Sequence, residues 1–416
     1  MKKIITIAAI WIISILLSVI WTFENTDVIG SFKAKLKEKQ GAPKTNFDSK
    51  ESNEEIIVVS NSFNVKAKKV ISLKGKTTFL LNNSNSGKFD AEDITIFTQN
   101  GFKLQKEKKE KLNINKNFTL EFNGGIKTIF FIEKKIYGLV SSVEKDCYYA
   151  SIVDFENSKE VFKTNCLLKE VNSAIDFNGL GSSFVRLDEN IIFSIGTPTQ
   201  DSTQINSLAQ DKKSYFGKIL NIDLKNIKKD SIQPSIFSLG HRNPQGLTKT
   251  KKYIFSVEHG PKGGDELNKI QFGENYGWPL VSYGTKYFFH DNGKSYRNNH
   301  EENGFKEPLY ALTPSVGISA VNNCPKKLIQ FYKKNCLLAL SLYGNELRQG
   351  KSLIIFLLDK NFEKIHSIEK IFLNDKLVMR HFMTNDKNEI YEDANGNIYV
   401  SADNEGIYQI SFQDFR

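Results

Sequence analysis

The stretch that decides the fold runs from Gly240 to Tyr287 and reads GHRNPQGLTKTKKYIFSVEHGPKGGDELNKIQFGENYGWPLVSYGTKY. It concentrates Gly, Pro, Asn, Asp, Glu and His, with one Trp and four Tyr, in a chain that elsewhere is rich in Lys, Asn, Ile and Phe. Two polar segments, HRNPQG at 241–246 and EHGPKGGDELN at 258–268, flank a short strand predicted at 253–257. Because a rigid sheet holds the loops at the ends of its strands, this pattern predicts a binding site in the two loops.

Short segments rich in β-branched and aromatic residues follow one another from about Glu54 to the C-terminus, each bounded by Asn, Gly, Asp or Lys. Roughly fifteen to twenty-four such strands are more than one sandwich holds. A blade of four strands with generous loops uses about sixty residues, which predicts an all-β, six-bladed β-propeller over residues 56–416. A pair of β-sandwiches is the alternative. No repeat of fixed period is visible, which argues against WD40 and kelch propellers.

The N-terminus predicts a membrane anchor. Two lysines precede an apolar run over residues 4–21, which is about the minimum length for crossing a bilayer and favours a cytoplasmic N-terminus. Residues 1–23 are either a signal anchor or a signal peptide, and the lack of an Ala-x-Ala-like site favours an uncleaved anchor helix. Residues 24–55 form a polar tether. We therefore expect a periplasmic propeller tethered to the inner membrane, if the source is a Gram-negative bacterium.

Charge and composition narrow the range of partners. The chain is 40% hydrophobic and 25% charged, which is typical of a globular protein. Its net charge of +10 comes from lysines scattered along the chain, and the one charged run, at 104–111, also contains acids. We therefore predict no nucleic-acid partner.

The four cysteines suit an oxidising compartment because their number is even and no C-x-x-C motif is present. Three pairings are possible. Proximity in sequence favours Cys147–Cys166 and Cys324–Cys336, and the second pair would staple a hairpin. Four buried free thiols are the alternative.

The segment EHGPKGGDELN has the composition of a metal-binding loop. Its glycines permit positive φ and close backbone approach, and Pro261 stiffens the turn. Asp265 and Glu266 add hard oxygen ligands, and calcium binds six to eight oxygens that include backbone carbonyls. The loop thus predicts a calcium site, with an ordinary turn as the alternative.

The segment HRNPQG supplies groups that recognise anions and polar ligands. Arg242 offers a planar fork for carboxylates, and Asn243 offers both a donor and an acceptor. The alternative is structural, with Arg242 paired to an acid such as Asp265. Downstream, Trp278 in the Gly-Trp-Pro turn is expected to pack with other aromatic residues.

In this order and spacing, GHRNPQGL, EHGPKGGDELN and NYGWPLVSYG resemble the glucose/sorbosone dehydrogenase family. A weaker resemblance extends from about Phe177 to the C-terminus. The resemblance implies a six-bladed propeller that binds calcium and pyrroloquinoline quinone. It also implies oxidation of a sugar at its C1 hydroxyl by hydride transfer to the quinone, with a histidine as base.

The resemblance assigns roles to residues of this chain. It places Arg242 and Asn243 near the quinone, and it gives the cofactor calcium to the backbone carbonyls of Gly260 and Pro261.

A further, structural calcium is implied at Asp265, Glu266 and Tyr276.

Two parts of the family pattern are missing. The base histidine falls near Gly179, where this chain has none, and Ser183 replaces the arginine that follows it. The quinone-clamping arginine pair falls near Glu389, whose charge would repel a tricarboxylate. Arg380 would substitute if the alignment moved by about nine residues.

A relocated base would come from His259, His290 or His300. The sequence thus supports two functions. One is a periplasmic quinone- and calcium-dependent aldose sugar dehydrogenase acting on a small-molecule sugar. The other is a catalytically silent, calcium-stabilised propeller that binds a sugar or a protein partner. The missing histidine leaves open which of them holds.

Overall fold

The computed structural model describes residues 47–48, 54–84, 88–106, 108–167, 174–226, 231–251, 253–286, 296–344 and 350–416. The predicted anchor at 1–23 and most of the predicted tether at 24–55 lie outside these residues. Within them, no helix is both long enough and apolar enough to cross a bilayer. Thr45–Arg416 form one compact unit, which is described below.

The described chain is almost entirely β-structure, as predicted, and four of its sheets have four antiparallel strands each. The first of these sheets along the chain contains β8 (Ile126–Ile132), β9 (Lys135–Glu144), β10 (Cys147–Asp154) and β11 (Lys159–Lys163), and the second contains β12 (Phe184–Leu187), β13 (Asn190–Ile195), β14 (Lys218–Asp223) and β15 (Ser235–Leu239). The third contains β16 (Pro244–Thr250), β17 (Tyr253–Glu258), β18 (Asp265–Ile270) and β19 (Tyr310–Leu312). The fourth contains β20 (Ile318–Asn323), β21 (Asn335–Ser341), β22 (Ser352–Leu358) and β23 (Ile365–Phe372).

A fifth, ten-stranded sheet joins the two ends of the unit. Its strand order contains two four-stranded runs, β3-β26-β25-β24 and β4-β5-β6-β7, joined where β24 pairs in parallel with β4. Its strands are β1 (Phe47–Asp48), β2 (Glu55–Val59), β3 (Asn64–Leu73), β4 (Thr77–Asn82), β5 (Ile94–Thr98), β6 (Phe102–Gln105), β7 (Lys108–Lys111), β24 (Met379–Thr384), β25 (Ile398–Ala402) and β26 (Gly406–Gln413).

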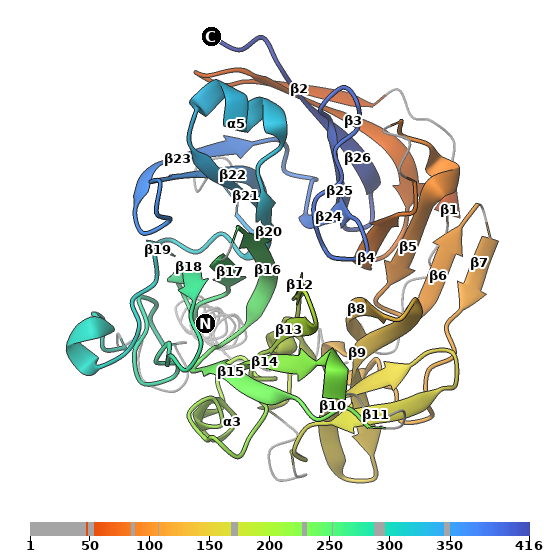
Figure 1. The fold of residues 1–416 in the computed structure, drawn as a ribbon, viewed down its shortest axis with the longest axis vertical. Helices are drawn as coiled ribbons and strands as arrows, with labels where there is room; N and C mark the ends of the chain where they lie inside the picture. Colours follow the sequence, from red (N-terminus) through yellow and green to blue (C-terminus); the bar gives the residue numbers. More distant parts are fainter. Residues whose placement is uncertain are drawn as a thin grey trace, which may run out of the picture. The chain divides into compact units, whose positions relative to one another are not determined.

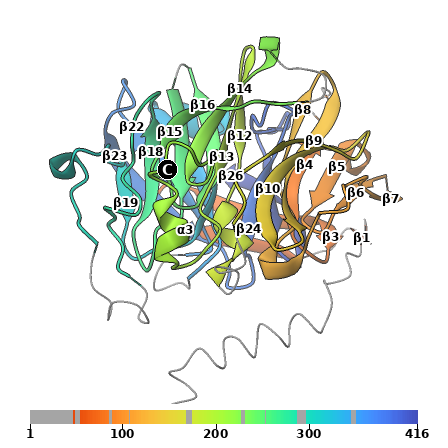
Figure 2. The ribbon, with the colours of Figure 1, turned by 90° about the horizontal axis from the view of Figure 1, so that it is seen from below.

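The residue pattern of a strand reflects whether one or both of its faces are buried. In β3 (NVKAKKVISL), alternate residues are buried, since successive side chains point to opposite faces of the sheet. In β22 (SLIIFLL), every residue is buried, because this middle strand is covered on both faces. The sheets stand around a common centre (Figure 1), and the side view shows the strands within them (Figure 2).

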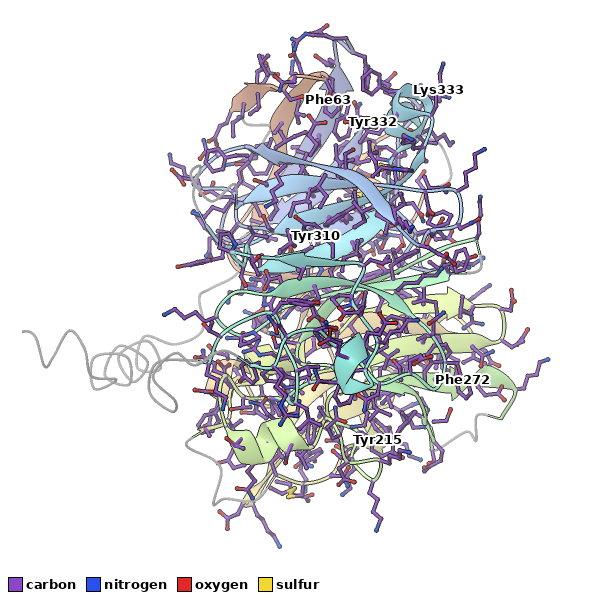
Figure 3. The ribbon with its side chains drawn as sticks, turned by 90° about the vertical axis from the view of Figure 1, so that its left-hand side faces the viewer. Phe63, Tyr215, Phe272, Tyr310, Tyr332 and Lys333 are labelled. Carbon is purple, nitrogen blue, oxygen red and sulfur yellow. A yellow bond between two sulfur atoms is a disulfide. The ribbon has the colours of Figure 1, made fainter. Side chains whose placement is uncertain are left out.

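The ring closes where the first long strand meets the last. β3 pairs antiparallel with β26 from Asn64↔Gln413 to Ser72↔Gly406. Next to this pairing, Phe63 packs edge-on against Phe412 and Tyr332, with ring centroids 5.6 and 6.3 Å away (Figure 3). Aromatic packing thus seals the joint between the two ends of the chain.

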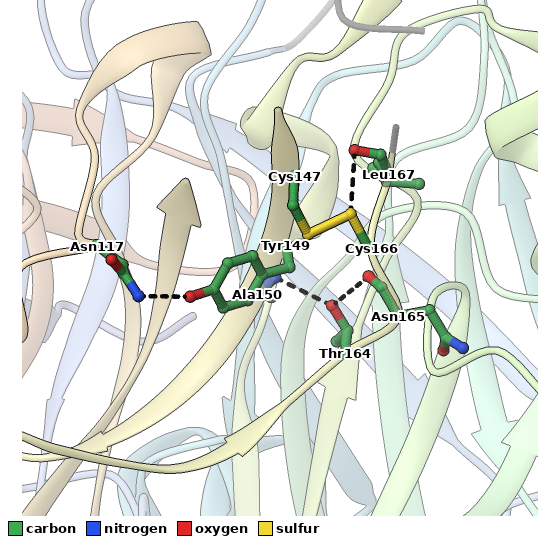
Figure 4. Close-up of a disulfide and its surroundings, with 8 residues drawn as sticks. All are labelled: Asn117, Cys147, Tyr149, Ala150, Thr164, Asn165, Cys166 and Leu167. Carbon is green, nitrogen blue, oxygen red and sulfur yellow. Dashed lines mark hydrogen bonds between the residues drawn. A yellow bond between two sulfur atoms is a disulfide. The ribbon is translucent and has the colours of Figure 1, made fainter. Parts of the chain in front are cut away.

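Both predicted disulfides are confirmed. Cys147, the first residue of β10, is bonded to Cys166, which follows β11 (Figure 4). Cys324–Cys336 links the end of β20 to the beginning of β21, around the short helix α5 (Lys326–Tyr332).

The strands nearest the centre in Figure 1 are β4, β8, β12, β16, β20 and β24. We call the residues within two positions of the first residue of each of these inner strands, together with the adjoining ends of neighbouring strands that bond to them, the inner rim. Backbone bonds join neighbouring parts of this rim: Ser182 donates to the Pro244 carbonyl at 2.8 Å, and Thr197 to the Arg242 carbonyl at 2.8 Å. The residues that form the candidate site are held there.

Candidate functional site

Arg242 lies just before β16 and is held by carbonyl groups. Its Nη1 donates to the carbonyl oxygens of His259 and Gly260 at 3.0 and 2.7 Å, and its Nη2 to that of Gln200 at 3.2 Å. The guanidinium lies 5.3 Å from the Trp278 ring centroid, and its buried Nε has no partner among the described residues. The alternative ion pair with an acid such as Asp265 is therefore not what the structure shows.

Asn243 is buried beside Arg242. Its Oδ1 accepts from Gln245 Nε2 at 2.8 Å, and its backbone carbonyl accepts from the His259 N–H at 3.0 Å. The two polar segments of the opening stretch thus meet at the inner rim.

Asp265 ties two loops together. Its Oδ2 accepts backbone N–H groups at 3.0, 2.7 and 3.1 Å from three successive residues, and its Oδ1 accepts the Gly260 N–H at 3.1 Å. The three donors are Val316, Gly317 and Ile318, at the beginning of β20. The carboxylate is 1% exposed, so all of its hydrogen bonding goes to the backbone.

Glu266 lies across the sheet from Glu258, its register partner on β17. Asn268 Nδ2 donates to both carboxylates, at 2.7 Å to Glu258 and 3.1 Å to Glu266. Burial, and next the charge of Glu258, raise the pKa of Glu266 well above its usual value. Burial opposes ionisation of Glu258 too, but His241 and the Arg242 N–H outweigh it and lower the pKa of Glu258. Glu258 is therefore the more acidic carboxyl of the pair.

Tyr276 does not join Asp265 and Glu266. Its hydroxyl donates to the Lys269 carbonyl at 2.6 Å and accepts the Gln271 N–H at 3.0 Å, while its ring stacks on His241 with centroids 4.7 Å apart. The side chains predicted to form the structural calcium site are thus engaged separately.

The loop predicted to bind the cofactor calcium is engaged in contacts within the protein. The Gly260 carbonyl faces the Arg242 guanidinium, and the Pro261 ring lies against Gly284, where a Cβ would come within 2.7 Å of its Cγ. Among the described residues, no three His, Cys, Asp or Glu side chains are grouped to hold a metal. In this arrangement the loop does not present the six to eight oxygens that calcium requires.

The position near Gly179, to which the resemblance assigns the base, is closed. Gly179 lies in a short 3-10 turn (Phe177–Leu180), and a Cβ there would stand 2.2 Å from the Thr197 carbonyl oxygen and 2.9 Å from the Thr199 nitrogen. The backbone packs too closely around Gly179 for any side chain, so a histidine would not fit at this position.

Of the three histidines considered as replacements, one lies at the inner rim. His259 Nε2 is buried without a partner among the described residues. Burial, and next the nearby charge of Arg242, lower the pKa of His259, against the opposite effect of Asp265. His300 is instead part of the Glu266 cluster, 3.6 Å from that carboxylate, and His290 lies outside the described residues.

The predicted position of the arginine clamp needs correction. β24 begins at Met379, which puts Arg380 on the inner rim, where its guanidinium forks onto the Asp403 carboxylate. Glu389 lies 3.7 Å from Lys249, near the opposite end of β16 from Arg242. Glu389 therefore does not lie beside Arg242, whereas Arg380 lies at the beginning of β24.

Sequence reasoning missed Lys127, the second residue of β8. Its Nζ donates to the Asn123 carbonyl at 2.9 Å. A lysine within the apolar run IKTIFFI was the available signal, because charged residues are rare in such strands unless they have a role there.

Known proteins match this chain in sequence and in fold. The family model "Glucose / Sorbosone dehydrogenase" matches residues 126–408, more than half of the chain. Aldose sugar dehydrogenase YliI of Escherichia coli is 36% identical over 121 residues, and quinoprotein glucose dehydrogenase B of Acinetobacter calcoaceticus is 41% identical over 109. The two matches cover 27% and 24% of this chain, and they span only part of the relatives' own length, 29% and 21% respectively.

The solved structures agree in fold. The apo aldose sugar dehydrogenase of E. coli superposes with a TM-score of 0.59 at 20% identity, over 83% of this chain and 99% of that one. The PQQ-bound aldose sugar dehydrogenase of Streptomyces coelicolor gives 0.53 at 16% identity, over 84% of this chain and 98% of that one. Together with the family match, which spans most of the ring and includes the three motifs, these findings place the fold as a propeller of this kind. The chain belongs to the glucose/sorbosone dehydrogenase family.

Proposed function

We propose that this protein is a quinone-dependent sugar dehydrogenase whose inner rim binds pyrroloquinoline quinone and oxidises the C1 hydroxyl of a small sugar. When bound, the quinone would accept the hydride from C1. The residues that would hold its carboxylates are Arg242 and Arg380, because guanidinium groups match carboxylates in shape and charge.

The observation that carries this proposal is the position of His259 beside these two arginines. Its unpartnered Nε2 is buried, and the lowered pKa keeps the ring neutral at neutral pH, so the nitrogen can accept a proton. We propose that His259 Nε2 takes the proton of the sugar hydroxyl, in place of a base at the closed position Gly179.

Calcium has no step in this proposal. The Gly260 carbonyl and the Asp265 carboxylate already accept hydrogen bonds, from Arg242 and from backbone N–H groups respectively. Binding of calcium at Gly260 and Pro261 would first require Arg242 to leave the Gly260 carbonyl.

The finer points of architecture and location are proposals of the same kind. The two four-stranded runs of the large sheet would count as two blades, which with the four smaller sheets makes six. A periplasmic location, with residues 1–23 as an inner-membrane anchor, follows from the apolar run and is supported by the two disulfides.

Reconstitution tests the proposed reaction. The purified chain, loaded with pyrroloquinoline quinone, is expected to reduce an artificial electron acceptor when aldoses are added. H259N should bind the quinone but lose about 10²- to 10⁴-fold in kcat. The matched control is H366N, which changes an exposed histidine on β23. Full activity in H259N, or none in the wild-type chain with any aldose, would overturn the proposal.

The closed backbone around Gly179 favours one other function, a propeller that binds a sugar without oxidising it. In that case calorimetry would detect sugar binding to the wild-type chain, while no acceptor would be reduced with or without the quinone.

A further inference from the structure

Ser182 has an unusual backbone conformation on the inner rim. It lies two residues before β12, and its φ is 103°. In the described part of the chain, every other non-glycine residue with a positive φ lies between 45° and 69°, in the left-handed region that side chains tolerate better. Glycine adopts a φ near 103° without strain, so a serine at this position lowers the stability of the fold.

The side chain of Ser182 adds a second unfavourable feature. The residue is 4% exposed, and its Oγ is buried without a hydrogen-bond partner among the described residues. A hydroxyl withdrawn from water in this way is unfavourable, because its bonds to water are lost and not replaced. The stability of the free protein therefore does not explain why a serine stands where a glycine would be more favourable.

Ser182 is joined directly to the segment that carries Arg242. Its N–H donates to the Pro244 carbonyl at 2.8 Å. The residue before it packs against the same segment, since a Cβ on Gly181 would stand 2.9 Å from Asn243 Oδ1. The exposed fractions are also similar, at 4% for Ser182, 7% for Arg242 and 6% for Asn243. Ser182 is thus about as accessible as the groups that the resemblance places near the quinone.

Two more buried polar atoms without partners among the described residues adjoin the same segment. They are Arg242 Nε and His259 Nε2, and the His259 N–H donates to the Asn243 carbonyl at 3.0 Å. Ser182 and His259 therefore bond to the carbonyls of two successive residues. Buried polar atoms are nearly always hydrogen-bonded, so three unpartnered ones around residues 242–244 indicate a site that a polar ligand completes.

We propose that Ser182 is a ligand-binding residue whose hydroxyl donates a hydrogen bond to an oxygen atom of the bound ligand. This inference rests on the proposed function. The oxygen belongs either to the sugar or to pyrroloquinoline quinone, since both present acceptor oxygens. The hydroxyl gains its partner only when the ligand is bound, so the serine contributes to binding while it lowers the stability of the free protein.

Two variants of the full-length chain separate the backbone from the hydroxyl. S182A removes the hydroxyl and keeps a side chain at this φ, whereas S182G removes both the hydroxyl and the strain. S158A and S158G are the controls, because Ser158 also has a positive φ, of 56°, and lies in the turn between β10 and β11. Urea unfolding measures stability. A fluorescence titration measures quinone binding to the cofactor-free chain, and calorimetry measures glucose binding with and without the quinone.

We expect S182G to unfold at a higher urea concentration than the wild-type chain, yet to bind one of the two ligands about three- to tenfold more weakly. S182A should show the same loss of binding without the gain in stability. A serine with a purely structural role would not separate the two properties. Weaker quinone binding assigns the bond to the cofactor, whereas unchanged quinone binding with weaker glucose binding assigns it to the sugar.

The same measurements distinguish failure of this inference from failure of the proposed function. If the wild-type chain binds no quinone, the proposed function fails, but weaker glucose binding by S182A and S182G still supports the inference. A lower urea midpoint for S182G than for the wild-type chain would overturn it, as would binding of both ligands by S182A and S182G as tight as by S158A and S158G. A wild-type chain that binds neither quinone nor glucose would overturn both proposals.

Discussion

Asp265 shows how a residue with the chemistry of a metal ligand serves the backbone instead. Its two oxygens accept four N–H groups from two loops, so the carboxylate orders the rim from within. D265N keeps the size but turns an amide toward some of these donors, which leaves buried N–H groups unsatisfied. We expect a loss of about 2–3 kcal/mol in the free energy of unfolding, measured in urea. The exposed D188N is the control, and an equal stability of the two variants would contradict this role.

His381 gives the rim a dependence on pH. Burial, followed by the charge of Arg380, lowers the pKa of His381 to about 3, and Asp403 opposes the shift only in part. The unfolded chain has a histidine pKa of about 6.5, so it binds a proton that the folded chain refuses. Stability should therefore fall as pH falls from about 6.5 toward 3.

Urea unfolding of the wild-type chain and H381Q across this pH range checks the prediction. The variant should lose less stability on acidification than the wild-type chain. Parallel pH profiles for the two proteins would show that His381 is not responsible.

For single residues, the sequence predicts where a residue lies better than what its side chain does. Arg242 and Asn243 are buried side by side just before β16, and their role toward the quinone stays a prediction. Glu389 does not lie beside Arg242, because the turn that contains it reaches β16 near Lys249, at the other end of that strand. The role of Asp265 depends on the Val316–Ile318 backbone, about fifty residues away, and no local pattern reports that contact.

The turn between β24 and β25 contains Glu389 and connects several inner strands. Asn388, with φ of 63°, projects from it and donates through Nδ2 to the Phe184 carbonyl at 2.7 Å and the Leu247 carbonyl at 3.2 Å. Its own carbonyl accepts Asn322 Nδ2 at 2.9 Å. One turn thus links β24 to three other inner strands.

N388G keeps the left-handed backbone and removes the amide. We expect it to lower the free energy of unfolding by about 1–3 kcal/mol, because two strand carbonyls lose a buried donor. D188G makes the same kind of change at an exposed turn, where φ is 45°, and should cost less. If N388G is as stable as D188G, the turn does not tie the inner strands together.

The Cys147–Cys166 disulfide fixes one edge of its sheet by closing a loop of 19 residues. In the chain-entropy account, a loop of this length stabilises the fold by about 3 kcal/mol. We expect C147S/C166S to lose roughly that amount in urea unfolding under oxidising conditions. A loss no greater than that of wild-type protein carrying an exposed substitution such as K111M would contradict the prediction.

The strands and the disulfides were the features most readily predicted from the sequence. Strand periodicity, turn residues and cysteine spacing are local properties, so the all-β texture and both disulfides could be predicted. The position of the 385–389 turn could not be predicted, because it depends on contacts with strands that are distant in the sequence.

For the whole molecule, ring closure explains why the site is built from both ends of the chain. β3 completes the sheet of β24, β25 and β26, and β4 then pairs with β24. Lys76 and Arg380, about 300 residues apart in the sequence, thereby become neighbours on the rim. The strand count suggested a propeller, but only closure shows that residues before the family match, which begins at 126, also contribute to the rim.

The most direct test of the account is a fluorescence titration of the cofactor-free, full-length chain with pyrroloquinoline quinone. The account predicts saturable binding of one quinone per chain. R242A should weaken it at least about tenfold, because a buried guanidinium fork is lost. R186A, which alters an arginine that bonds the Asp188 carbonyl in the β12–β13 turn, beyond the end of β12 opposite the inner rim, should leave it unchanged. No saturable binding by the wild-type chain, or equal affinities for R242A and R186A, would contradict the claim that the inner rim is a quinone site.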